Sequence, residues 1–138
     1  MASSEKIRES MLSNAQEITR LHGLIHETLK LRSQSPQKRE IWANACAEFH
    51  SRYDRLAFPG GYKDAVQRLA QGDPDTVEAA LCFLECRPYF FRSGYMFKKI
   101  LKKVKHASLS PSQSERLEEV KEKLAEWKMR KKSAEQKL

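Results

Sequence analysis

The sequence predicts an all-α protein that forms a single domain of about five to six helices. Apolar residues recur every three or four positions along most of the chain, and no alternating segment is long enough to predict a β-strand. All five prolines stand where a helix would begin or end. A chain of 138 residues is long enough for one core, so we treat 1–138 as one domain. We expect antiparallel helical hairpins, arranged as a closed bundle or as a short HEAT-like α-solenoid.

The N-terminal segment, residues 1–32, is predicted to form one long helix over about 4–31. Its apolar residues fall on one stripe, which favours packing against the core of the same chain. The same stripe would also suit a homo-oligomer, and we keep that as the alternative. The residues of the stripe are Ile7, Met11, Ala15 (or Asn14), Ile18, Leu21, Ile25 and Leu29.

The helical core is predicted to span residues 33–132, and its second helix begins at Ser35-Pro36. The serine oxygen can accept a hydrogen bond from a free N–H group, and proline at the first helical position loses no hydrogen bond. This helix should end near Ala57, because residues 58–61 read FPGG and predict a turn.

A short helix over 62–71 is expected next, and it should end at Gly72. Asp73-Pro74 predicts the start of the fourth helix by the same combination of cap and proline. The body of that helix, TVEAALCFLEC, is apolar on nearly every side, which is typical of a helix at the centre of a core. Pro88 should end it.

Residues 87–106 read RPYFFRSGYMFKKILKKVKH and carry seven of the net eight positive charges, with no acidic residue. We predict a helix from about Gly94 to His106. Its apolar residues, together with two phenylalanines before it, should face the core, with the lysines on the opposite side. The predicted core residues are Phe90, Phe91, Phe97, Ile100, Leu101 and Val104.

The last helix is predicted to begin at Ser110-Pro111, where Gln113 can complete a capping box. Its apolar seam consists of Leu117, Val120, Leu124 and Trp127. Residues 133–138 are expected to form a frayed tail.

The basic segment provides the candidate site, a surface that binds an anionic partner. Lysines supply point charges, arginines can fork onto carboxylate or phosphate oxygens, and tyrosines can stack on unpaired bases. We expect a non-catalytic binding or adaptor protein that engages an acidic protein partner. The alternative is a nucleic-acid binding protein without sequence specificity, and an anionic membrane ranks third because the apolar stripe is needed for the core. The predicted site residues are Arg87, Tyr89, Arg92, Tyr95, Lys98, Lys99, Lys102, Lys103 and Lys105.

Two pairs of side chains could hold zinc if their helices packed side by side. Cys46 and His50 are four residues apart, as are Cys82 and Cys86. This spacing is rare in closed zinc sites, and cysteine is a good small core residue. We therefore predict no metal and no cofactor.

No catalytic signature is present, so we do not expect an enzyme. The chain lacks a P-loop and a G-x-S-x-G motif, and His22 and His26 lack the glutamate that a zincin pattern needs. Glu85, at the end of an apolar helix, could be a partly buried carboxylate with a raised pKa, but an ion pair with its neighbour Arg87 is the simpler expectation. No run of 18 apolar residues predicts a transmembrane segment, and three cysteines without a disulfide framework favour reduced thiols in the cytoplasm.

Overall fold

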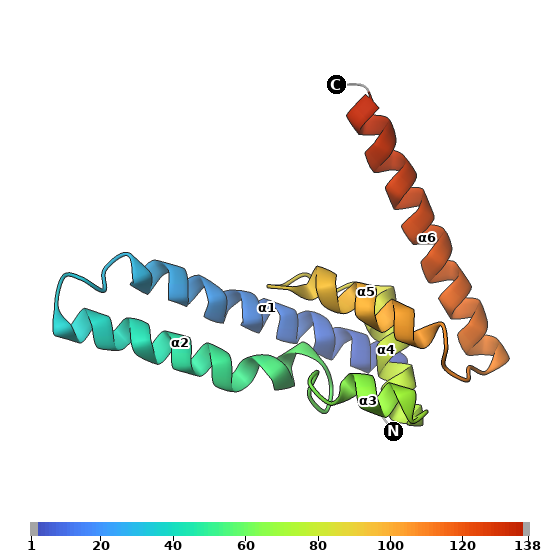
Figure 1. The fold of residues 1–138 in the computed structure, drawn as a ribbon, viewed down its shortest axis with the longest axis horizontal. Coiled ribbons are helices and arrows are strands. Elements are labelled where there is room, and N and C mark those ends of the chain that lie inside the picture. Colours follow the sequence, from blue (N-terminus) through green and yellow to red (C-terminus); the bar gives the residue numbers. More distant parts are fainter. Residues whose placement is uncertain (1–2, 137–138) are drawn as a thin grey trace.

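The computed structural model describes residues 3–136 as six α-helices, with no β-strand in that range, arranged as a small helical bundle (Figure 1). The all-α prediction is confirmed, and of the two expected arrangements the protein adopts the bundle. The helices are α1 (Ser4–Leu29), α2 (Pro36–Ala57), α3 (Ala65–Ala70), α4 (Pro74–Cys86), α5 (Ser93–Val104) and α6 (Pro111–Gln136).

Three helices begin at the caps that the sequence predicts. The side chains of Ser35, Asp73 and Ser110 each accept a hydrogen bond from the backbone N–H three residues later. The Gln113 side chain accepts a hydrogen bond from the Ser110 N–H, which completes the capping box before α6. Each such cap stabilises its helix by about 1 kcal/mol.

Helix α4 is the centre of the core, as its composition predicts. It contacts α1, α3, α5 and α6, and Ala80, Leu81 and Phe83 are fully buried. The Phe83 ring lies 6.1 Å from the Phe58 ring and 6.4 Å from the Phe90 ring, measured between centroids. Full burial of a phenylalanine side chain contributes about 2–3 kcal/mol, so this cluster holds the ends of α2 and α4 together.

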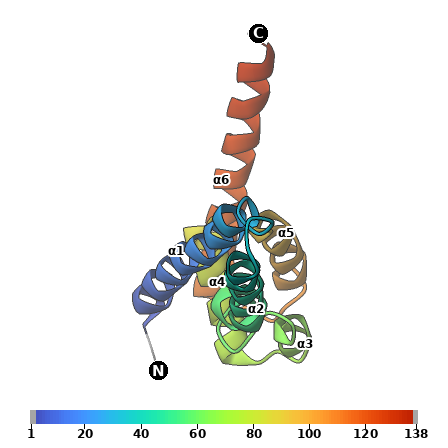
Figure 2. The same cartoon turned by 90° about the vertical axis from the view of Figure 1, so that its left-hand side faces the viewer.

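Helices α1 and α2 run antiparallel and form a long hairpin that extends from the body (Figures 1 and 2). Near the body the α1 stripe is buried, which confirms that it packs on the core; its buried residues are Met11, Ala15, Ile18 and Leu21. Farther out, residues 22–48 contain no buried side chain. We call residues 22–48 the hairpin arm.

Helix α6 rises away from the body in both views (Figures 1 and 2). Only Leu117 and Val120 of this helix are buried. The helix continues through Gln136, so residues 133–136 are helical where the sequence suggested a frayed tail, and 137–138 lie outside the described residues. None of the described helices is long and apolar enough to cross a membrane.

Candidate functional site

The connection between α4 and α5 contains two residues other than glycine whose backbone is in the left-handed region of φ/ψ space. Arg87 has φ 44° and Arg92 has φ 68°, a conformation that favours glycine and costs about 1 kcal/mol or more for other residues. The Arg87 N–H donates to the Phe83 carbonyl and closes the end of α4. The Tyr53 hydroxyl donates to the Phe91 carbonyl at 2.7 Å, which ties the connection to α2.

Helix α5 turns the predicted apolar stripe toward the core. Phe97, Ile100, Leu101 and Val104 are buried, and so are Phe90 and Met96. The prediction that Phe91 belongs to the core is wrong, because its side chain is 43% exposed. Its neighbour Phe90 occupies the inward position, and the Phe91 ring stacks instead on His22 at 4.5 Å between centroids.

All nine predicted site residues are exposed. None of the seven cations among them forms an ion pair with any residue between 3 and 136. Their charge is therefore not neutralised within the described part of the chain. The nine are Arg87, Tyr89, Arg92, Tyr95, Lys98, Lys99, Lys102, Lys103 and Lys105.

The structure divides these residues among different surfaces. Four of the cations line a groove between α5 and α6, namely Arg87, Lys98, Lys102 and Lys105. Tyr89, Arg92 and Tyr95 line a hollow beside α1, and Lys98 also reaches it. Lys103 lines a third hollow, next to the end of α3. The residues that the sequence predicted to form a single patch therefore lie on at least three separate surfaces.

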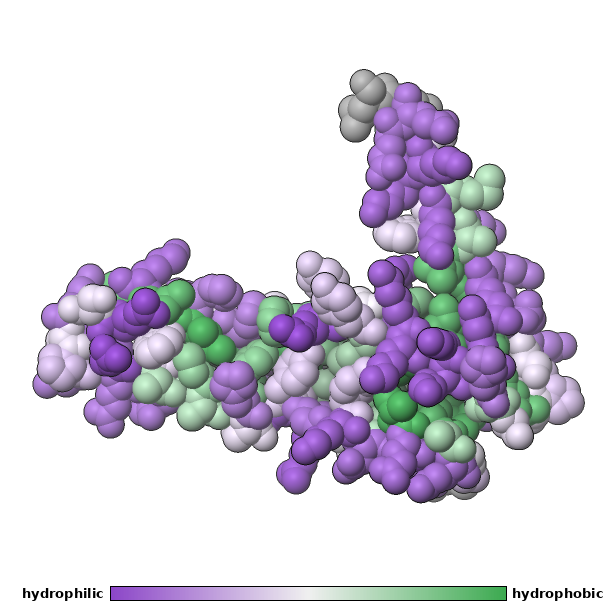
Figure 3. Space-filling view, in the orientation of Figure 1, coloured by the Kyte–Doolittle hydropathy of each residue, from purple (hydrophilic) through white to green (hydrophobic). Residues whose placement is uncertain are grey.

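The groove between α5 and α6 has a volume of about 720 Å³ and an apolar floor. Three further lysines from α6 form its far wall, and Glu135 is the only acidic residue among the described residues that line it. In Figure 3, purple hydrophilic side chains border a green hydrophobic strip at the angle between the two helices. The floor consists of Phe97, Leu101, Leu124 and Trp127, and the α6 wall of Lys128, Lys131 and Lys132.

Arg87 lines this groove and lies over two aromatic rings of its floor. Its guanidinium carbon is 4.8 Å from the centroid of Phe97 and 4.8 Å from that of Trp127. A guanidinium in this position makes a cation–π interaction with each ring. The expected pair between Arg87 and Glu85 is therefore wrong, because Arg87 in its left-handed conformation reaches the rings instead.

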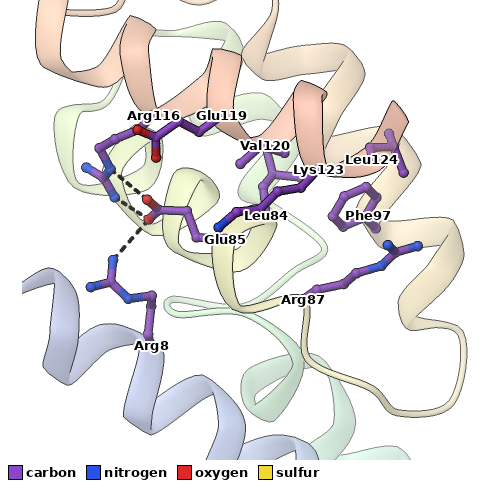
Figure 4. Close-up of a pocket in the computed structure, with 10 residues that line it drawn as sticks. All are labelled: Arg8, Leu84, Glu85, Arg87, Phe97, Arg116, Glu119, Val120, Lys123 and Leu124. Carbon is purple, nitrogen blue, oxygen red and sulfur yellow. Dashed lines mark hydrogen bonds and ion pairs between the residues drawn. The ribbon is translucent and has the colours of Figure 1, made fainter. Parts of the chain in front are cut away.

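Glu85 belongs to a separate ion-pair cluster that joins α1, α4 and α6 (Figure 4). The Arg116 side chain donates to both Glu85 oxygens and to both Glu78 oxygens. Arg8 of α1 donates to Glu85 at 3.0 Å, and the Ser4 hydroxyl donates to Glu78 at 2.6 Å. The cluster fixes the first turns of α6 to α4, next to the groove.

The pKa values of this cluster follow from two opposing effects. Desolvation alone would raise the pKa of Glu85, but hydrogen bonds and charge from Arg116 and Arg8 outweigh it and lower the pKa. The same balance, with hydrogen bonds from Ser4 and Arg116, lowers the pKa of Glu78. Both carboxylates are therefore ionised at neutral pH and act as structural partners of Arg116.

The hollow beside α1 has a different chemistry, with exposed aromatic side chains around it. Tyr89 is 89% exposed and Tyr95 is 76% exposed. His22 lies at its back, and burial together with the charge of His26 lowers the His22 pKa. This hollow of about 550 Å³ offers stacking surfaces and the cations Arg92 and Lys98.

The four zinc candidates are not brought together. Cys46 and His50 lie on α2, which packs along α1, whereas Cys82 and Cys86 lie on α4, which packs on α1, α3, α5 and α6. Cys82 is fully buried, and burial raises the pKa of Cys86 to about 11. Within residues 3–136, no three His, Cys, Asp or Glu residues are grouped so that they could hold a metal ion.

The sequence reasoning missed the part that α6 plays in the groove. Trp127 and three lysines of α6 complete it, although Trp127 was assigned to the seam of the last helix. A signal was present, because Lys128, Lys131 and Lys132 are spaced by three and one, which keeps them close together around the helix. Nothing in the sequence specified that α5 would lie opposite them.

Comparison of the chain with known protein families, with curated proteins and with solved structures gives no match. The groove and the aromatic hollow are the two features that bear on the function.

Proposed function

We propose that the protein is a non-catalytic helical binding or adaptor protein whose basic surface, residues 87–106, engages an acidic protein partner. The observation that carries this proposal is the set of seven exposed cations without an ion-pair partner in residues 3–136. Such a surface attracts carboxylates and raises the rate of association with an acidic protein.

An acidic protein is favoured over a nucleic acid because of what lies beside the cations. The lysines of α5 border an apolar floor that includes Leu101 and Trp127. A phosphate backbone has no apolar groups to bury there, whereas a polypeptide can present carboxylates and apolar side chains together. Aromatic and arginine side chains such as Trp127 and Arg87 are also the types that dominate binding energy at protein interfaces.

The second candidate function is nucleic-acid binding without sequence specificity. It is supported by Tyr89 and Tyr95, which are exposed and adjacent to Arg92. Stacking of a base on such a ring contributes about 1–3 kcal/mol. The two functions differ in the surface they need, because stacking uses the hollow beside α1 and the protein partner uses the lysines of α5.

Two further expectations belong to this proposal. The three free cysteines support a cytoplasmic location. A homo-oligomer through residues 1–32 stays a prediction. Met11, Ile18 and Leu21 of α1 are buried in the core of the chain, whereas Leu12 on the same helix is 45% exposed.

The test compares fluorescein-labelled acidic peptides rich in Glu and Leu with single- and double-stranded RNA and DNA of equal charge, by fluorescence anisotropy at two salt concentrations. We expect the acidic peptides to bind more tightly than the oligonucleotides. A triple charge reversal, Lys98→Glu with Lys102→Glu and Lys105→Glu, should abolish the binding.

The matched control is the triple variant Lys6→Glu, Lys30→Glu and Lys63→Glu, which changes the net charge equally at exposed lysines outside residues 87–106. Equal losses in both variants would mean that net charge alone attracts the peptide, and the proposal would fail. Tighter binding of oligonucleotides that is lost in Tyr89→Ala/Tyr95→Ala would establish the second candidate instead.

A further inference from the structure

The groove between α5 and α6 has cations on both sides at helical spacing. Along α5 and its C-cap, successive lysines that line the groove are four and then three residues apart. Along α6 the corresponding intervals are three residues and one residue. Residues at these intervals share one face of a helix, so each helix presents its lysines toward the groove. The lysines are Lys98 and Lys102 on α5, Lys105 at its C-cap, and Lys128, Lys131 and Lys132 on α6.

The floor between these lysines is an apolar strip. Phe97 and Leu101 come from successive turns of α5, and Leu124 and Trp127 from successive turns of α6. Trp127 remains 40% exposed, so it is available to a further apolar group. Apolar side chains of a partner would be buried on this floor, and acidic side chains would pair with the lysines on either side.

Arg87 adds a directional group to the floor. Its guanidinium carbon lies over the rings of Phe97 and Trp127, at 4.8 Å from each centroid, and it forms no ion pair within residues 3–136. A guanidinium can bind a carboxylate in a bidentate arrangement by donating two N–H hydrogen bonds to its oxygens. A carboxylate that points into the groove would thus meet a donor that is already oriented.

We infer that the occupant of this groove is an acidic amphipathic α-helix of the protein partner, with apolar residues on the floor and carboxylates toward the lysines of both walls. This inference rests on the proposed function and names the kind of partner. Lys98 and Lys105 are seven positions apart in the sequence, about 10 Å along the helix axis, so an occupant of about three turns covers them. Binding of an amphipathic helix in an apolar groove through residues at i, i+3, i+4 and i+7 is an established mode of recognition.

The first experiment is a selection from a displayed library of 14-residue peptides, randomised at every position among Glu, Asp, Leu, Phe, Ala, Ser and Lys. We expect enriched peptides to combine acidic residues with apolar residues three or four positions apart. Enrichment of acidic residues without that period would overturn the inference and leave the proposed function standing. No enrichment of acidic residues would contradict both.

The second experiment uses two double variants that are matched in helix, spacing and charge. Lys98→Glu/Lys102→Glu alters lysines that line the groove, and Lys99→Glu/Lys103→Glu alters lysines of α5 that do not. With the enriched peptide, we expect the first variant to raise Kd about tenfold or more and the second about threefold or less, because close charge pairs outweigh screened ones. Equal changes in Kd would overturn the inference.

The third measurement reports directly on the floor. In a Trp42→Phe background, Trp127 is the only tryptophan of the chain. We expect its fluorescence maximum to shift to shorter wavelength when the enriched peptide binds, because its exposed ring becomes covered. Binding with no change in Trp127 emission would place the peptide elsewhere and contradict the inference.

Discussion

Arg116 is the residue on which the attachment of α6 depends most. Its side chain is 21% exposed and lies between Glu78 and Glu85, which are 25% and 22% exposed. One guanidinium therefore compensates two partly buried carboxylates, and the hydrogen bonds from Ser4 and Arg8 complete their coordination. Removing it leaves both carboxylates without their main partner.

We expect Arg116→Met to lower the free energy of unfolding by about 2 kcal/mol, because breaking a buried ion pair leaves uncompensated charge and this cluster is partly exposed. Urea unfolding followed by circular dichroism measures the change. Arg130→Met on the same helix, at an exposed position without an ion pair, is the control and should change it by about 0.5 kcal/mol or less. Equal effects of both substitutions would contradict this role of Arg116.

The same cluster predicts a pH dependence of stability. The pKa values of Glu78 and Glu85 are lowered in the folded protein, so near pH 4 the folded state binds fewer protons than the unfolded state. This contribution is present above the unfolded pKa of about 4.3 and is lost as the pH falls through the lower folded values. The difference in unfolding free energy between wild type and Arg116→Met should therefore shrink between pH 7 and pH 3. A difference that stays constant would contradict the prediction.

Among the elements, α4 was the most predictable from the sequence. Its start is set by Asp73 and Pro74, its end by Pro88, and its burial by an apolar composition, all of which are local properties. The only surprise at its end is Arg87, which adopts the left-handed conformation without being glycine. Local signals fix where a helix begins and ends more firmly than they fix which neighbour it meets.

A substitution at the start of α4 tests the contribution of its cap. The Asp73 carboxylate accepts hydrogen bonds from the Thr76 N–H and from the Thr76 hydroxyl, and these lower its pKa. We expect Asp73→Ala to reduce the free energy of unfolding by about 1–2 kcal/mol. Asp75→Ala, in the same turn but exposed, should cost less, because it loses only an interaction with the helix dipole. Thermal unfolding of both variants makes the comparison, and equal losses would contradict it.

The sequence predicted the α5 side of the groove but not the α6 side. The charge of 87–106 singled out its arginines and lysines together with Tyr89 and Tyr95, and all of these side chains are exposed. The contribution of Trp127 and the α6 lysines depends on how α6 crosses α5, and the pairing of Arg116 with Glu78 depends on how it crosses α4. These are tertiary contacts between residues far apart in the sequence, and no local pattern specifies them.

At the scale of the whole molecule, the protein consists of a buried body and two extensions. The body is built around α4, whereas the hairpin arm and the second half of α6 contain no buried side chain. Regions with few buried apolar contacts open locally at a smaller free-energy cost than the core.

Hydrogen exchange should therefore follow three levels. We expect the backbone amides of α4 to exchange slowest, those of the hairpin arm faster, and those of α6 after Trp127 fastest. Mass spectrometry of peptic fragments measures all three in one experiment. Protection of the hairpin arm equal to that of α4 would contradict this order and indicate that the arm is covered in solution.

Helix α6 is attached to the body near its N-terminal end, and its C-terminal part extends away from the body. Arg116 clamps its second turn to α4, and the remaining twenty residues extend about 30 Å beyond that point. A rotation of about 10° at this pivot would displace the tip by about 5 Å, by simple trigonometry on that length. Arg116, Glu78 and Glu85 do not line the groove, so a substitution that weakens this ion pair would change the angle between α5 and α6 without altering a residue of the groove itself.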